Sequence, residues 1–179
     1  MLVREPRAPG GYALAGGGAP AAQEAVAAVA LAAAGALAAL PEVLGGGLAA
    51  PPLLQLARYG PDGAAYPRHA DNDERLAGSP EYTQGPPGLR VCDREVTALL
   101  YLNAEGGAWE PGRDGGTLRL WAPGSDAAGG GAPDLELAPE AGRLVLFDSR
   151  AVEHEVAPAF RERWALSAWY PAAAALEKG

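Results

Sequence analysis

Short runs of alternating or continuously apolar residues fill most of the chain after residue 53. Each run is bounded by Gly, Pro, Asp or Asn, which favour turns between strands. The runs cover residues 53–59, 96–103, 117–122, 135–138, 143–149, 154–160 and 163–170. Several short strands separated by turn signals are typical of a β-sandwich, a barrel or a jelly roll. The sequence therefore predicts a mainly β domain.

One helical pattern precedes the strands, over residues 25–40. Its apolar residues fall close to one stripe at helical spacing: Val26, Val29, Leu37 and Leu40. Gln23 and Glu24 open the segment and Pro41 is expected to end it. The segment is too short and too rich in alanine for a membrane span, so we expect no membrane association. A signal or transit peptide is the alternative, because Arg4 and Arg7 precede it.

Composition divides the chain into four parts. They are a Gly/Pro/Ala-rich N-terminal segment expected to be poorly ordered (1–20), a helix and connector that pack on the core (21–52), the β domain (53–172) and a short tail (173–179). Two longer connections lie within the β domain, at 72–94 and 104–116. Long loops on a β scaffold often shape a functional site.

The charge balance excludes one class of partner. The chain carries 14 Lys and Arg against 22 Asp and Glu, a net charge of −8, and its basic residues form no run. Nucleic-acid binding needs a clustered basic face, so we expect none. Cys92 is the only cysteine, which rules out an intramolecular disulfide and a cysteine-based zinc site. A reducing compartment, the cytoplasm or nucleus, is expected, with organellar targeting by the N-terminus as the alternative.

Both histidines of the chain stand in suggestive places. His69 and Asp71 lie in the stretch YPRHADND, and His154 lies at the start of a late predicted strand. A His-x-Asp step on a strand points both side chains to one face. Two histidines and one carboxylate leave further coordination positions open, which suits non-haem Fe(II) oxygenases. A zinc hydrolase is an alternative, but no general base stands beside these residues.

The last predicted strand, RWALSAWY, carries an unusual arginine. Strand alternation places Arg163, Ala165, Ser167 and Trp169 on one face, and Trp164, Leu166, Ala168 and Tyr170 on the other. Both faces carry aromatic residues, so both are expected to be covered. An arginine facing the interior is costly unless it meets an anion, and its planar fork suits a carboxylate.

A tyrosine on a second strand is placed to help bind the same anion. In VTALLYLN, alternation puts Tyr101 on one face with Thr97 and Leu99. The alternatives are structural: Arg163 would form a salt bridge with Asp148 or Glu162, and Tyr101 would be an ordinary core tyrosine.

Four motifs together resemble a known family. They are YGPDGAAYPRHADN, VTALLYLN, DGGTLRLW and HEVAPAFRERWALSAWY, and the resemblance that they carry runs from about residue 53 to 170. They resemble, in the same order, the Egl-nine, oxygen-sensing type of prolyl 4-hydroxylase, within the Fe(II)- and 2-oxoglutarate-dependent dioxygenases. A His-x-Asp step alone is a weak signal, whereas the whole ordered set is strong. The resemblance implies a double-stranded β-helix (a jelly roll of the cupin kind) with a supporting N-terminal helix.

The resemblance also implies roles for individual residues. His69, Asp71 and His154 would be the Fe(II) ligands. Arg163 would bind the distal carboxylate of 2-oxoglutarate, and Tyr101 would donate to the same group. The other residues of the cosubstrate pocket would be Tyr59, Leu99, Leu118, Val156 and Ser167. The residues at the substrate entrance would be Arg94, Trp169 and Tyr66. For Arg94 and Trp169 the alternatives are a solvated arginine and a core tryptophan.

The activity implied is hydroxylation of a prolyl residue at C4 in a protein or peptide, with release of succinate and CO2. The cosubstrates would be 2-oxoglutarate and O2, with ascorbate as a reductant, and a monomer is expected. Two alternatives stay open: the same oxygenase chemistry on a small molecule or another side chain, and a metal- or ligand-binding module without turnover. The stretch 72–95 is longer than in animal members, and the segment before residue 53 shows no clear match. Both departures leave the target protein open.

Overall fold

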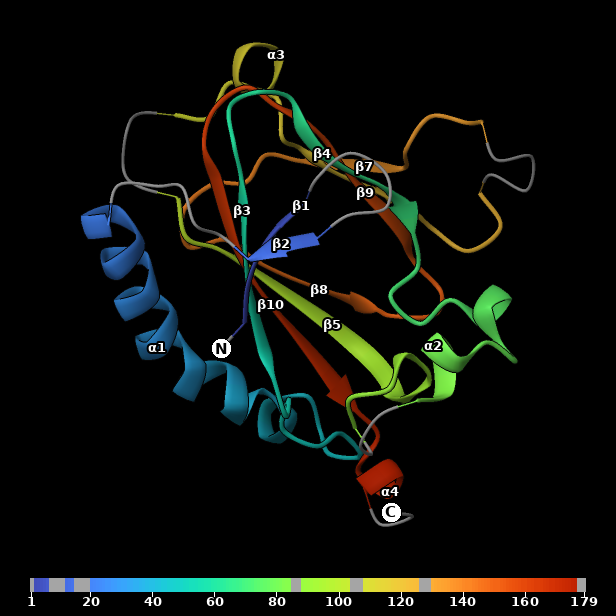
Figure 1. Ribbon diagram of the computed structural model, residues 1–179. Helices are drawn as coiled ribbons and strands as arrows, with labels where there is room; N and C mark the ends of the chain where they lie inside the picture. The colour runs from blue at the N-terminus through green and yellow to red at the C-terminus, as the bar shows by residue number, and fades with distance from the viewer. Residues whose placement is uncertain are drawn as a thin grey trace.

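The computed structural model describes residues 2–6, 12–14, 20–84, 88–103, 108–125 and 130–176. Two β-sheets form the core (Figure 1). The larger sheet has the order β2-β1-β3-β10-β5-β8, with β1 (Leu2–Pro6), β2 (Tyr12–Leu14), β3 (Leu54–Tyr59), β5 (Arg94–Tyr101), β8 (Leu144–Asp148) and β10 (Arg163–Pro171). The smaller sheet has the order β4-β9-β6-β7, with β4 (Ala64–His69), β6 (Leu118–Trp121), β7 (Leu135–Leu137) and β9 (Glu153–Ala159).

Nearly all strand pairs are antiparallel, and only β1 runs parallel to its neighbour β3 among the described pairs. The helices are α1 (Pro20–Val43), η1 (Glu74–Leu76), α2 (Pro80–Thr83), η2 (Val91–Asp93), α3 (Pro111–Asp114) and α4 (Ala173–Leu176). The architecture is the mainly β jelly roll that the sequence indicates. Within the described residues, no helix combines the length and apolar character of a membrane span.

Every apolar run predicted as a strand contains one, but three strands were not predicted. β4 is missing from the prediction because AAYPRH shows no clear alternation; its pairing with β9 makes it a strand. β1 and β2 lie in the segment 1–20, for which the sequence predicts poor order. The other residues of that segment, 1, 7–11 and 15–19, lie outside the described part of the chain.

Helix α1 is longer than predicted at both ends, and Pro41 does not end it. Proline lacks the N–H that would bond to the carbonyl four residues earlier, here that of Leu37. The Tyr170 hydroxyl donates to the Leu37 carbonyl instead, at 2.8 Å. This hydrogen bond from β10 satisfies the carbonyl that Pro41 leaves without its helical partner, and the helix continues through Pro41 to Val43.

The buried stripe of α1 also differs from the predicted one. Ala30 and Leu37 are buried and lie seven residues apart, which is two helical turns. Val29 is rotated about 100° from Ala30 and is 53% exposed, so it is wrongly placed in the predicted stripe. The side chain of Val26 lies outside the described residues.

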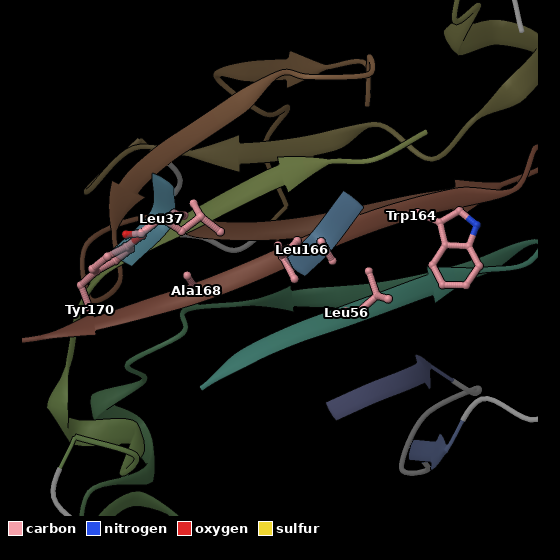
Figure 2. Close-up of a cluster of buried hydrophobic side chains, with 8 residues drawn as sticks. Leu37, Leu56, Trp164, Leu166, Ala168 and Tyr170 are labelled. Atoms are coloured by element: carbon pink, nitrogen blue, oxygen red, sulfur yellow. The ribbon is translucent and has the colours of Figure 1, made fainter. Parts of the chain in front are cut away.

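Helix α1 runs along the larger sheet and covers one face of it (Figure 1). Figure 2 shows the buried residues of this layer, which come from α1, β3 and β10: Leu37, Leu56, Trp164, Leu166, Ala168 and Tyr170. A second apolar cluster joins the two sheets: Leu99, Tyr101, Leu118, Leu120, Phe147 and Ala165. The three strands β3, β10 and β5 of the larger sheet therefore pack on both faces, and the face turned away from α1 faces the smaller sheet.

Candidate active site

A pocket of about 680 Å³ lies between the two sheets. Its walls come from strands β3, β4, β5, β6, β9 and β10 and from the segment between β4 and β5. The sequence-predicted residues that line it are Tyr59, Tyr66, His69, Asp71, Arg94, Leu99, Leu118, His154, Val156, Arg163, Ser167 and Trp169. Tyr101 is the exception: it is fully buried beside Arg163 and does not line the pocket.

The three predicted metal ligands come together on neighbouring strand ends. His69 is the last residue of β4 and is paired in register with His154 of β9. Asp71 lies in the turn that follows β4, so strand alternation does not explain why its side chain lies beside that of His69. One donor atom from each residue lies within 4.8 Å of the other two. Asp71 Oδ1 is 3.5 Å from His69 Nε2, and Asp71 Oδ2 is 3.7 Å from His154 Nε2.

Neighbouring groups orient these donors. His69 Nδ1 lies 2.9 Å from the carbonyl of Pro67, which can only accept a hydrogen bond, so Nδ1 carries a hydrogen and the ring is held with Nε2 towards Asp71. Asp71 accepts a hydrogen bond from the Thr97 hydroxyl at 2.7 Å. The ring of His154 packs against Phe147, with 4.7 Å between the ring centroids. Such outer contacts are typical of metal ligands.

The charge states of the cluster suit metal binding. Burial raises the pKa of Asp71, but hydrogen bonds from His69 and Thr97 and the charges of both histidines outweigh it, and the pKa falls well below its usual range. Burial lowers the pKa of His154 to about 4. At neutral pH the site therefore holds an ionised carboxylate and a neutral His154 imidazole, the forms that bind a metal ion.

A buried cation stands at the other end of the pocket. Arg163 is 1% exposed, and its guanidinium carbon lies 4.6 Å from the Tyr59 ring centroid and 5.0 Å from that of Tyr101. Arg163 Nε and the Tyr101 hydroxyl are buried and have no hydrogen-bond partner among the described residues. Burial raises the pKa of Tyr101, so its hydroxyl stays protonated and able to donate. These groups fit a carboxylate.

The structural alternative for Arg163 is not realised. Glu162 forms its salt bridge with Arg58, at 2.6 Å, and Asp148 accepts hydrogen bonds from the backbone of the turn that follows it. Within the described part of the chain Arg163 has no ion-pair partner. A buried, unpaired guanidinium is costly, so a bound anion would compensate this cost.

A glycine makes room for the arginine. Gly116, in the motif DGGTLRLW, has a φ of +64°, which favours glycine. A Cβ at this position would lie 3.2 Å from Arg163 Cδ and 3.3 Å from Ala159 Cβ. A side chain there would therefore push against Arg163 and its surroundings.

The entrance of the pocket carries a stacked pair. The Arg94 guanidinium carbon lies 4.3 Å from the ring centroid of Trp169, and Arg94 Nη1 donates to the backbone carbonyl of Asp71 at 3.2 Å. Arg94 is thus attached to the metal-ligand loop and is not a freely solvated arginine. Tyr66 packs against His69, with 4.6 Å between ring centroids.

Several residues of the site are not among those predicted from the sequence. Gln55 and Ala57 line the pocket beside Tyr59, and the alternation of LLQLARY would have predicted both. Asn72 and Ser149 are fully buried next to Asp71 and Thr97, but nothing in the local sequence indicates that they lie together. Their proximity depends on contacts between β4, β5 and β8.

The donor sets fit an Fe(II) ion and a dicarboxylate. Two imidazoles and one carboxylate on one side of a metal leave positions open for further ligands, as in non-haem Fe(II) oxygenases. Arg163 and Tyr101 supply buried donors for a carboxylate at a distance from the triad, with the apolar side chains of Leu99, Leu118 and Val156 in the pocket wall.

Comparisons with known proteins agree with this chemistry. The hypoxia-inducible factor prolyl hydroxylase of Caenorhabditis elegans is 34% identical over 116 residues, which are 64% of this chain and 13% of the relative. Egl nine homolog 1 of Homo sapiens is 33% identical over 116 residues, 64% of this chain and 21% of the relative. The chain thus spans well under half the length of these relatives.

Solved structures show the same relationship. A prolyl-4-hydroxylase of Pseudomonas putida is 34% identical, with a TM-score of 0.50 over 89% of this chain and 70% of that chain. A prolyl hydroxylase of Trichoplax adhaerens, in complex with a hypoxia inducible factor peptide, is 28% identical, with a TM-score of 0.53 over 74% of this chain and 49% of that chain. The family model of the 2OG-Fe(II) oxygenase superfamily matches residues 54–171. The chain therefore belongs to the 2OG-Fe(II) oxygenase superfamily.

Proposed function

We propose that the protein is an Fe(II)- and 2-oxoglutarate-dependent oxygenase that hydroxylates a prolyl residue at C4 in a protein substrate, with release of succinate and CO2. The observation that carries the proposal is the pocket itself. It holds the triad of His69, Asp71 and His154, and Arg163 lies in the same pocket without an ion-pair partner among the described residues. A metal-binding module without turnover would leave Arg163 unexplained.

The residues of the chain have distinct tasks in this reaction. Fe(II) with bound 2-oxoglutarate and O2 supplies the oxidising chemistry. His69, Asp71 and His154 hold the metal, and Arg163 and Tyr101 bind and orient the far carboxylate of 2-oxoglutarate. The apolar side chains between them exclude water from the reacting region.

A protein substrate is supported by the relatives and by the entrance. The worm relative is named as a prolyl hydroxylase, and the Trichoplax enzyme was solved with a peptide. Arg94 and Trp169 form a rigid stacked surface beside the triad, against which a pyrrolidine ring can pack. A small molecule or another side chain as substrate is the competing hypothesis, because fold and iron site do not distinguish the two.

The first test is an anaerobic titration of the metal-free protein with Fe(II) and 2-oxoglutarate. A visible metal-to-ligand charge-transfer band is expected in the wild type and not in His154→Ala. A folded protein without the band in either form would contradict the proposal.

The second test addresses the substrate. Consumption of 2-oxoglutarate is measured with a library of proline-containing peptides and with matched peptides in which alanine replaces proline. Turnover that requires proline, with a peptide product that gains one oxygen atom on the ring, is expected. Coupled turnover with the alanine peptides would instead support another side chain as the target.

A further inference from the structure

Two buried hydroxyl groups lie behind Asp71, outside the pocket. Thr97 is 1% exposed and Ser149 is fully buried, and neither lines the pocket. Thr97 Oγ1 lies 2.7 Å from Asp71 Oδ2 and 2.8 Å from Ser149 Oγ. The three side chains therefore form a continuous hydrogen-bonded chain that ends on a predicted metal ligand.

The direction of this chain follows from what each group can donate. An ionised carboxylate only accepts hydrogen bonds, so Thr97 must donate its single hydroxyl hydrogen to Asp71. Thr97 can then only accept from Ser149. The order is Ser149 to Thr97 to Asp71. A hydroxyl that accepts one bond is a stronger donor of the next, because such chains polarise one another.

The backbone next to Asp71 is also hydrogen-bonded to the strands β5 and β8, near Thr97 and Ser149. Asn72 N–H donates to the Ser149 carbonyl at 2.8 Å, and Asn72 Nδ2 donates to the Arg94 carbonyl at 2.7 Å. Ser149 N–H donates to the Glu95 carbonyl at 2.9 Å. The turn after β4 is thus tied to the start of β5 and to the end of β8, the two neighbouring strands of the larger sheet (Figure 1).

We propose that Ser149 and Thr97 are positioning residues, which together fix the rotation of the Asp71 carboxylate so that it is already oriented for the metal ion. This inference rests on the proposed function only in that a metal binds to His69, Asp71 and His154. A carboxylate that is free to rotate must be ordered when the metal binds, and loss of such outer contacts typically weakens metal affinity by about 10- to 100-fold.

The test is a titration of the metal-free protein with Co(II), which reports both affinity and, through its visible spectrum, the arrangement of the ligands. Thr97→Val keeps the shape of the side chain and removes its hydroxyl. We expect it to bind Co(II) about 10- to 100-fold more weakly, with a changed spectrum. Thr97→Ser keeps the hydroxyl and is expected to restore most of the affinity. Ser149→Ala removes only the hydrogen bond from Ser149 to Thr97. Its affinity for Co(II) is expected to lie between those of Thr97→Ser and Thr97→Val.

A matched control separates positioning from loss of packing. Thr117 is also a buried threonine, 4% exposed, and does not line the pocket. Thr117→Val is expected to bind Co(II) as the wild type does. A folded Thr97→Val with the affinity and spectrum of the wild type would overturn the proposal. If Thr97→Val does not fold, Ser149→Ala tests the proposal in its place. A Ser149→Ala protein with the Co(II) affinity and spectrum of the wild type would also overturn the proposal.

Failure of the proposed function would look different. Wild type and His154→Ala would then bind Co(II) equally, because the metal would not sit at the triad. A wild type that binds Co(II) through His154, together with an unaffected Thr97→Val, would contradict only the positioning role.

Discussion

The two faces of β10 carry out different tasks with alternate residues of one strand. One face, with Leu166 and Tyr170, packs under α1 in a layer that is almost entirely apolar. The other face, with Arg163, Ser167 and Trp169, lines the pocket and buries a charge without an ion-pair partner in the described part of the chain. The helix-facing side stabilises the fold, whereas the buried charge on the pocket side lowers the stability of the protein until a ligand binds.

This difference shows why the site lies where it does. Strands β3 and β5 pair with β10 on either side and continue both surfaces, so each face extends across three strands. The apolar layer holds the strands in register and so places the polar groups of the opposite face. We expect substitutions on the two faces to separate stability from ligand binding.

The largest expected effect is on cosubstrate binding. Arg163→Met should weaken 2-oxoglutarate binding by at least about 30-fold, because losing one partner of a buried charge pair costs about 2–5 kcal/mol. The stability of the ligand-free protein should stay the same or rise, since an unpaired buried charge is removed. Calorimetric titration with 2-oxoglutarate and Mn(II), beside thermal unfolding, measures both.

Arg58→Met is the matched control for this change. Arg58 also lies on the larger sheet, but it pairs with Glu162 and does not line the pocket. The Arg58→Met substitution should leave the affinity for 2-oxoglutarate unchanged. Equal losses in the two variants would show that Arg163 does not bind the carboxylate.

The next effect is on the opposite face of the same strand. Leu166 is fully buried under α1, and Leu166→Ala should lower the free energy of unfolding by about 2–5 kcal/mol. Metal and 2-oxoglutarate affinities of the folded fraction should not change. Urea unfolding followed by ligand titration tests this. Leu146→Ala, at a position 38% exposed on β8, should cost much less, and an equal cost would contradict the assignment of the core.

On the pocket side, the burial of His154 should make the free energy of unfolding depend on pH under mildly acidic conditions. An unfolded histidine titrates near pH 6.5, whereas burial lowers the pKa of folded His154 to about 4. Between these values the unfolded chain takes up a proton that the folded chain does not. The contribution of His154 to the free energy of unfolding is therefore fully present above pH 6.5 and is lost as the pH is lowered. In the metal-free protein the loss between pH 7 and pH 5 should be about 2 kcal/mol.

Two neighbouring groups stay outside this pH window. The pKa of Asp71 is lowered, so its contribution is lost only below the ordinary aspartate range, and the pKa of Tyr170 on the helix face is raised by burial to about 12. Urea unfolding at both pH values should show a smaller pH dependence in His154→Gln than in the wild type. Parallel curves for the two proteins would contradict the burial of a neutral His154.

The smallest effect concerns the bond that carries α1 past Pro41. Tyr170→Phe removes the donor to the Leu37 carbonyl and should cost about 1 kcal/mol, since a buried acceptor loses its partner. Hydrogen exchange should increase in the last turn of α1, and ligand affinity should stay the same. Unchanged exchange there would mean that Tyr170 does not support the helix end.

The local sequence predicted the strands after β4 together with β3, and the chemical groups of the site, but it did not predict β1, β2 or β4. Alternation in RWALSAWY and VTALLYLN assigned each residue to the correct face, because successive strand residues point to opposite sides whatever the neighbours are. The chain has only two histidines, so His69 and His154 were the only imidazole ligands that the sequence could offer a metal ion. Glycine and proline marked the turns, since their backbone preferences are local.

Only the tertiary structure decided how these pieces meet. Asp71 reaches the two histidines from a turn, Asn72 and Ser149 are buried beside it, and Tyr170 completes a helix far away in the chain. Local propensity carries no information on such contacts, because they depend on the register between strands that are distant in sequence. The sequence by itself determined which groups are available for chemistry, and the packing of two sheets and one helix determined which of them share a site.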